Sequence, residues 1–99
     1  MNFDEIIDKF IDFNNIEVIK VVQYSPDTIL TLLNIDNKKY VLVETDYFND
    51  YYENMHIQEA FDLKVENWLE PKNYNPKEYD ALAYYNRETN VAYGLAAVK

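Results

Sequence analysis

Three apolar runs rich in β-branched residues follow one another between residues 16 and 45, and the links between them are very short. The runs, residues 16–24, 28–35 and 39–45, predict strands. Residues 25–27 (SPD) fit a turn with proline at its second position, and residues 36–37 (DN) tolerate a left-handed backbone. Because a parallel crossover needs about a dozen residues or more, these links predict an antiparallel meander.

An amphipathic helix is predicted ahead of the meander, over residues 2–13. Its apolar residues recur at intervals of three and four, which is one face of a helix: Phe3, Ile6, Ile7, Phe10 and Ile11. Asn2 and Glu5 have the spacing of a capping box, and Asn14-Asn15 is expected to end the helix. Strands that are apolar on both sides need partial cover on each face, so we expect this helix to cover one face.

The next part of the chain, residues 44–70, is named here the acidic segment. It holds eight acids and one base, Lys64, so it carries 1 − 8 = −7 of the formal net charge of −9. Helical spacing of its aromatic residues predicts a second, acidic helix from about Asn49 to Asp62. Residues 63–69 either extend this helix or form a short strand.

The remainder is predicted to be a loop followed by a hairpin. Asn67 to Pro76 is rich in Asn and Pro and predicts a loop, and residues 75–78 have the pattern of a helix start. Apolar residues 81–85 and 91–98 flank the polar stretch 86–90, which predicts a C-terminal β-hairpin. The whole chain, residues 1–99, is thus expected to be a single α+β domain with one sheet covered by helices.

The residue inventory argues against most catalytic chemistry. The chain has no Cys, one Gly and one His, which excludes thiolate catalysis, disulfides and glycine-rich phosphate loops. His56 beside an acid, and weak Mg²⁺ or Ca²⁺ binding by Asp46, Asp50 and Glu53, remain minor alternatives. We therefore expect no enzyme activity, no catalytic residue, no cofactor and no resident metal.

The net charge bears on partners and location. A charge of −9 and a pI near 4.4 oppose direct binding to nucleic acid or to anionic membranes, and favour association with basic surfaces. The N-terminal sequence shows no signal-peptide pattern, and no apolar run approaches the about 18 residues of a membrane span. We expect a cytoplasmic protein, in the host cytoplasm if a phage encodes it.

Acids spaced three or four residues apart and interleaved with tyrosines can imitate a row of phosphates and anchor a basic protein. The alternative is a solvated acidic face whose tyrosines turn inward. The predicted partner-binding residues are Glu44, Asp46, Tyr47, Asp50, Tyr51, Tyr52, Glu53, Glu59 and Asp62.

In size, acidity, lack of Cys and compact α+β layout, the chain resembles small proteins that bacteriophages use against host defences, among them anti-CRISPR proteins. The resemblance is one of composition and implies no functional residue. The first hypothesis is an inhibitor, encoded by a phage or mobile element, that blocks a basic nuclease or other nucleic-acid-binding protein as a partial nucleic-acid mimic. The second is an immunity protein or antitoxin against a basic toxin. The third is a structural accessory subunit that self-associates, as a homodimer for example, through an edge strand at residues 91–98.

Overall fold

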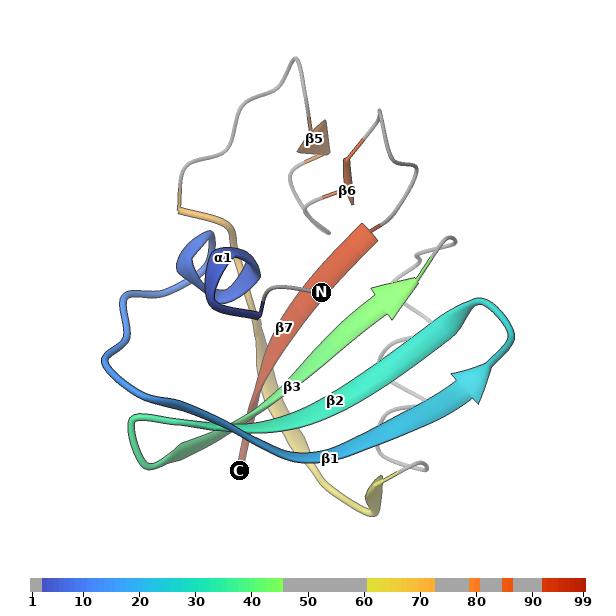
Figure 1. The fold of residues 1–99 in the computed structure, drawn as a ribbon, viewed down its shortest axis with the longest axis horizontal. Coiled ribbons are helices and arrows are strands. Elements are labelled where there is room, and N and C mark those ends of the chain that lie inside the picture. The colour runs from blue at the N-terminus through green and yellow to red at the C-terminus, as the bar shows by residue number, and fades with distance from the viewer. Residues whose placement is uncertain (1–2, 46–60, 73–78, 81–84, 87–91) are drawn as a thin grey trace.

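The computed structural model describes residues 3–45, 61–72, 79–80, 85–86 and 92–99 of the 99-residue chain. Its main element is a five-stranded antiparallel sheet in the order β1-β2-β3-β7-β4 (Figure 1). The strands are β1 (Ile16–Ser25), β2 (Thr28–Ile35), β3 (Lys38–Thr45), β4 (Val65–Leu69) and β7 (Ala92–Val98). The described fold is sheet-dominated with one short helix, whereas the sequence predicted two helices over the sheet.

The predicted antiparallel meander is confirmed. β2 and β3 pair without interruption from Thr28 opposite Thr45 to Ile35 opposite Lys38. The link between them places Asp36 at φ 50° and Asn37 at φ 68°. Two consecutive residues at positive φ are what a type I′ hairpin turn requires, so Asp and Asn here do the work usually given to glycine.

The first helix, α1 (Phe3–Asp8), is shorter than the predicted helix over residues 2–13. Helical turns continue to Ile11, whose N–H donates to the Ile7 carbonyl at 3.0 Å. Beyond that point tertiary partners replace helical ones, because the Lys9 carbonyl accepts the Lys72 N–H at 2.8 Å. Among the described residues, no helix is long and apolar enough to cross a membrane.

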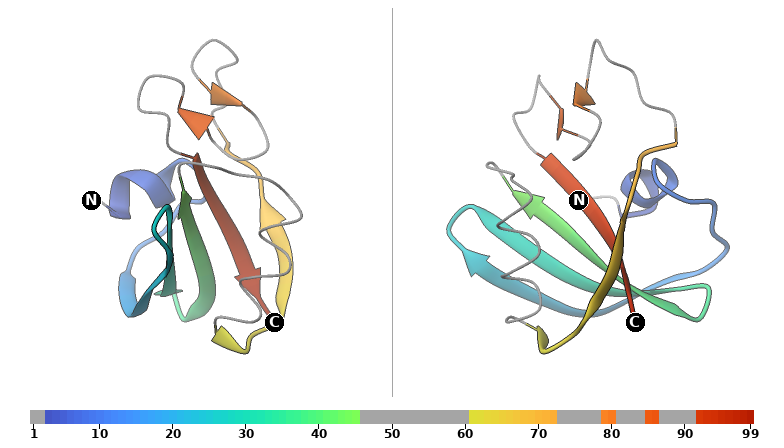
Figure 2. Two further views of the ribbon diagram at one scale, coloured as in Figure 1. Left: turned by 90° about the vertical axis from the view of Figure 1, so that its right-hand side faces the viewer. Right: turned by 180° about the vertical axis from the view of Figure 1, so that it is seen from behind.

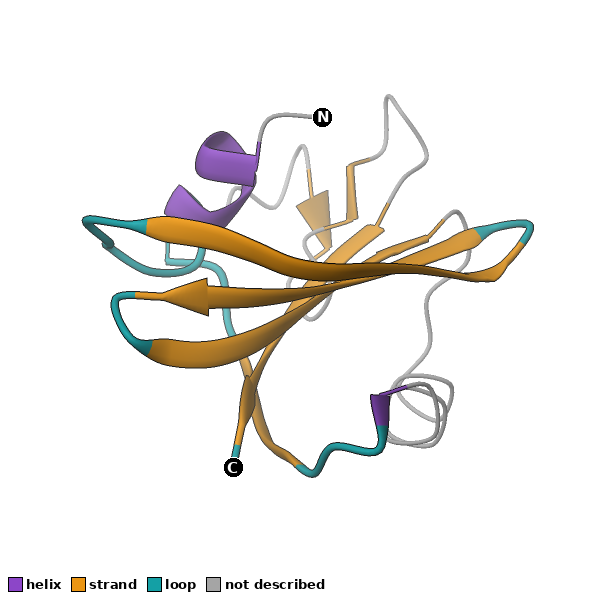
Figure 3. Cartoon of the chain, turned by 60° about the horizontal axis from the view of Figure 1, so that its bottom comes forward, coloured by secondary structure: helices purple, strands orange, loops and turns teal. Residues whose placement is uncertain are grey.

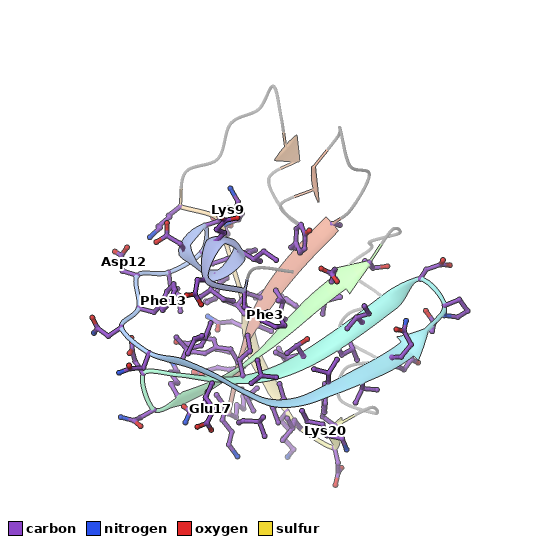
Figure 4. All side chains as sticks on the ribbon, in the orientation of Figure 1. Phe3, Lys9, Asp12, Phe13, Glu17 and Lys20 are labelled. Atoms are coloured by element: carbon purple, nitrogen blue, oxygen red, sulfur yellow. The ribbon has the colours of Figure 1, made fainter. Side chains whose placement is uncertain are left out.

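One face of the sheet is covered by α1, as predicted. The helix contributes Ile6, Ile7 and Phe10 to a buried cluster with Leu33 and Leu42 of the sheet. Figure 4 shows Phe3 and Phe13 on the side of α1 toward the sheet, while Lys9 points away from it. We call this the helix side of the sheet.

The opposite face has its own cluster, built around Leu30, Val41 and Val43 and covered in part by residues 61–68. Figure 3 shows α1 and the segment at residue 61 on opposite sides of the sheet. Most of the predicted acidic helix, residues 46–60, lies outside the described residues. Phe61 is helical and Val65–Leu69 forms β4, which settles the choice left open for residues 63–69 in favour of a strand.

The predicted C-terminal hairpin and the loop from Asn67 are wrong in the described part of the chain. β7 pairs with β3 on one side and with β4 on the other, and β4 includes Asn67 to Leu69. Leu95 is fully buried, as a central strand that is covered on both faces allows. The helix start predicted at residues 75–78 lies outside the described residues.

A second, small pair of strands stands apart from the main sheet. β5 (Tyr79–Asp80) pairs antiparallel with β6 (Tyr85–Asn86), with Tyr79 opposite Asn86. Figure 2 shows this pair beyond the end of the sheet at which β7 begins. The strand predicted at residues 81–85 therefore contributes Tyr85 to this pair and not to a hairpin with β7.

We expect Ile7→Ala to lower the free energy of unfolding by about 3 kcal/mol, since Ile7 has no exposed surface and the deletion leaves a cavity under α1. Ile7→Val, which removes one methylene, is expected to cost about 1 kcal/mol. Chemical denaturation measures both values. Equal, small losses in the two variants would show that α1 does not depend on this contact.

A second prediction concerns the loop between α1 and β1. The Asp36 carboxylate accepts the N–H groups of Asn14 and Asn15 at 2.9–3.0 Å, and the Asp36 N–H donates to the Asn15 carbonyl at 3.0 Å. Asp36→Gly keeps the positive φ and loses only the carboxylate, so we expect a loss of about 1–2 kcal/mol. Asp36→Ala in addition places a residue with a Cβ that disfavours positive φ at this position, so we expect it to lower the free energy of unfolding by about 1 kcal/mol more.

Urea denaturation of the two variants separates these contributions. If Asp36→Gly is as stable as the parent protein, the carboxylate does not hold the loop. If Asp36→Ala equals Asp36→Gly, the left-handed conformation is not retained in the variants.

Candidate functional site

Two of the nine predicted partner-binding residues lie in the described part of the chain, Glu44 and Asp62. The other seven fall within residues 46–60, outside the described residues. Glu44 is on β3, between Ile29 of β2 and Tyr93 of β7. Asp62 follows Phe61 and has φ 53°.

The structure does not bring these two acids together. Glu44 has the same orientation as Tyr40 and Leu42 on β3, which belong to the helix-side cluster. Asp62 adjoins Phe61, which packs on the cluster of the opposite face. Figure 1 shows the segment at residue 61 at the lower edge of the view, below β1, and the end of β3 above β1 and β2. In the described part of the chain, the acidic segment does not form one continuous surface.

Glu44 belongs instead to an open hollow of about 340 Å³ on the helix side of the sheet. The hollow lies at the end of the β1–β2 hairpin, and three stretches distant in the sequence contribute to it. We call it the Glu44 hollow. Its lining residues are Gln23, Pro26, Asp27, Ile29, Glu44, Thr45 and Tyr93.

The lining of the Glu44 hollow has a clear chemical character. Among the described residues, its lining includes two carboxylates, Asp27 and Glu44, and one tyrosine ring, Tyr93, but no Lys, Arg or His. Glu44 is half-buried on an otherwise apolar stretch of β3, while Asp27 is exposed in the turn. Carboxylates beside an aromatic ring are suited to an ammonium or guanidinium group, by charge and by cation–π attraction.

Local hydrogen bonds fix the hairpin end that forms this hollow. The Gln23 side-chain amide donates to the Ser25 carbonyl at 2.5 Å and to the Thr28 carbonyl at 3.2 Å. The Asp27 N–H donates to Ser25 Oγ at 3.3 Å. Asp27 is therefore held by an ordered turn and not by a freely moving loop.

A second hollow, of about 520 Å³, lies between the turn at residues 36–37 and the start of β1. Four asparagines line it with Glu17 and Asp36. Asn34 Oδ1 is buried and, among the described side chains, has no hydrogen-bond partner. A donor from water would satisfy it, since a buried acceptor left alone costs about 1–3 kcal/mol.

A third surface is apolar. On β1, Val18, Ile19 and Val21 are 43%, 45% and 54% exposed. We expected partial cover on both faces of the strands, and β1 has it at Ile16 on the helix side and at Val22 and Tyr24 on the other face. As an outermost strand, β1 has neighbouring residues on one side only among the described strands.

Sequence reasoning located Glu44 but missed its surroundings. Gln23, Asp27 and Tyr93 carry no motif and come from a hairpin and from the C-terminal strand. The one sequence signal near these residues is the turn pattern at residues 25–27. It predicts a chain reversal but does not show which strand lies beside the turn. Metal binding gains no support in the described ranges, where no three His, Asp or Glu side chains are grouped as ligands.

Comparison of the chain with protein-family models, with curated proteins and with solved structures finds no match. The assignment of a function therefore rests on the chemistry of these surfaces.

Among the described titratable groups, Lys72 is the one whose pKa is clearly shifted. Its ammonium donates to Asp12 Oδ1 and lies 3.6 Å from Asp8 Oδ1, which raises the pKa of Lys72 above 10.5. The hydrogen bond to Asp12 is the largest cause. Because the folded-state pKa lies above the unfolded one, this pairing stabilises the fold below pH 10.5 and is lost as pH rises through the folded-state pKa.

We therefore expect NMR titration of the Lys72 side chain to give a pKa above 10.5, and Asp12→Asn to lower it. Asp27→Asn, a neutralisation in the distant hairpin turn, is the matched control and is expected to leave the Lys72 titration unchanged. A Lys72 pKa at or below the ordinary value, or equal effects of both variants, would contradict the assignment.

Proposed function

We propose that this chain is a small acidic inhibitor, encoded by a phage or mobile element, that binds a basic surface of a nucleic-acid-binding host protein such as a nuclease. The observation that supports the proposal is the Glu44 hollow, where two carboxylates and a tyrosine lie close together in the described part of the chain. The role is one of binding, and no catalytic group is assigned.

The hollow is suited to one long basic side chain of the partner. Its volume of about 340 Å³ is near the lower end of ligand pockets, which run from about 300 to 1,000 Å³. Arg or Lys can place its charge near Glu44 and Asp27 and its apolar stem against Ile29. Arg and aromatic side chains are enriched among the few residues that contribute most of the affinity of protein interfaces.

The net charge of −9 supplies the long-range part of the recognition. A nucleic-acid-binding groove is lined by Lys and Arg, so its field attracts an acidic protein and raises the association rate. In this proposal the acidic segment, residues 44–70, supplies most of the attracting charge and the Glu44 hollow supplies a defined contact.

The immunity-protein hypothesis uses the same surfaces with a toxin as partner, and the identity of the captured protein separates the two. The accessory-subunit hypothesis required residues 91–98 at an edge of the sheet. That placement is wrong, because β7 lies between β3 and β4.

The test begins with capture of a partner by the tagged chain from lysate of the source cells or, for a phage protein, of the phage host. Asp27→Asn/Glu44→Gln keeps the side-chain shapes and removes two charges from the hollow. We expect at least about a tenfold rise in the dissociation constant for the captured basic protein, measured by calorimetry.

Glu66→Gln/Glu70→Gln is the matched control, since both residues are exposed acids of the acidic segment outside the hollow. We expect it to change the affinity by less than about threefold, as rim charges do. A captured partner that is not basic would overturn the proposed function.

Charge reversal of three acids of the acidic segment distinguishes the contribution of that segment to binding from the contribution of the hollow. Asp46→Lys/Asp50→Lys/Glu53→Lys is expected to abolish binding while the circular dichroism spectrum is retained. If this triple variant abolishes binding and the hollow variant has no effect, the basic partner stands and the contact assigned to the hollow is wrong.

A further inference from the structure

The outer strand β1 has the features of an interface. It is ten residues long and pairs with β2 alone among the described strands. Three of its large apolar residues, Val18, Ile19 and Val21, are the exposed large hydrophobics of the described chain. A long outer strand with exposed apolar residues can add a further strand along its free backbone edge.

An irregularity in β1 decides which of its side chains share a face. Val18 is opposite Leu33 and Lys20 is opposite Leu32, so Ile19 is one extra residue in β1. Glu17 is opposite Asn34, two residues from Leu32 on β2. Residues two apart on a strand lie on the same face, so Glu17 and Lys20 both lie on the face away from α1.

We propose that β1 pairs antiparallel with β1 of a second copy of this chain, with Glu17 of each copy opposite Lys20 of the other. The two-fold axis then passes between Val18 and Ile19, and the two sheets join into one continuous sheet. Figure 4 shows Glu17 and Lys20 along the rim of the molecule formed by β1.

In this register, every pair of facing residues matches in charge or in apolar character. Glu17 meets Lys20 twice, because the axis repeats the contact, and opposite charges across strands are favourable. Ile16 meets Val21, both on the helix side according to their partners Ile35 and Thr31 on β2. Val18 meets Ile19 on each side of the two-fold axis, so two apolar pairs lie at the centre of the contact.

Other registers lose these contacts. A shift that places Glu17 opposite Val22 keeps the faces matched but leaves both charges opposite apolar residues. Pairing Lys20 with Lys20 brings like charges together, which is unfavourable. The charge pattern of β1 is therefore complementary to itself in one register.

The charge of the chain also favours β1 as the contact between copies. Within β1, Glu17 and Lys20 cancel, so a neutral strand forms the edge of a chain whose net charge is −9. The net charge of each copy makes the two copies repel each other at long range. Repulsion between the two copies is screened by salt, so dimerisation is expected to strengthen as salt rises.

Pairing of two six-residue strand segments buries less surface than a standard interface of about 1,600 Å². We therefore expect a weak dimer with a dissociation constant on the order of 10–100 µM. Sedimentation equilibrium of the full chain from about 5 µM to 1 mM, at low and high salt, measures it. A monomer throughout this range overturns the proposal.

Charge swapping tests the register. Glu17→Lys and Lys20→Glu each place like charges in contact, so each is expected to weaken the dimer at least about tenfold. The double variant Glu17→Lys/Lys20→Glu restores opposite charges and is expected to return the constant to within about threefold of the parent protein. Failure of the double variant to recover dimerisation overturns the register.

Lys64→Glu is the matched control, because it adds the same charge as Lys20→Glu at an exposed residue outside β1. A Lys64→Glu dimer as weak as the Lys20→Glu dimer would show a general charge effect and overturn the proposal.

This inference goes beyond the proposed function and fails separately from it. The paired segment, residues 16–21, contains none of the lining residues of the Glu44 hollow. Binding of a basic partner weakens as salt rises, whereas the dimer strengthens. Loss of dimerisation in Lys20→Glu with partner affinity retained would support both proposals.

Discussion

The pairing of β3 with β7 is the contact on which the rest of the molecule depends. The chain leaves the sheet after Thr45 and returns at Ala92 to lie along β3, from Thr45 opposite Ala92 to Tyr40 opposite Ala97. β7 then carries β4 on its other edge, with Trp68 opposite Ala96. Without this non-local contact the meander β1–β2–β3 would end at an exposed edge of β3, and neither face could be completed. Since such contacts close long loops, we expect them to limit the rate of folding.

Small side chains on β7 make this arrangement possible. Ala92, Gly94 and Ala96 alternate on the face away from α1, and all are buried. The large Trp68 side chain of β4 lies beside one of them, Ala96, and fills space that the small side chains of β7 leave open. The close neighbour that these small residues admit is a strand of the same chain.

The three surfaces described above differ in character because of their places in the sheet. The Glu44 hollow combines a central strand, a hairpin turn and β7, so its carboxylates and its tyrosine meet only through strand order. The β1 edge is neutral and apolar because nothing in the described chain covers it. In the two proposals, one chain presents an acidic contact for a basic partner and a self-complementary edge at residues 16–21, and the two surfaces share no residue.

Sequence alone determined the elements whose partners are close in the chain. The strands from Ile16 to Thr45 follow from β-branched composition, and their antiparallel order follows from the two short links. The position of α1 over one face follows from its apolar spacing, although its length does not. The Lys72 N–H binds the Lys9 carbonyl, and the Asp36 carboxylate binds the N–H groups of Asn14 and Asn15, and these partners lie far along the sequence.

Tertiary structure decided the rest. A pattern of apolar residues shows that a strand is buried but not which strand lies beside it, so residues 91–98 predicted a hairpin and an edge, and β7 became a central strand. The candidate site depended on the same choice. The concentration of acids in residues 44–70 identified Glu44 as a candidate. The position of Asp27 and Tyr93 beside Glu44 depends on the strand order. Local chemistry specifies each strand through its own side chains, whereas neighbours are selected by the burial of both faces of the sheet at once.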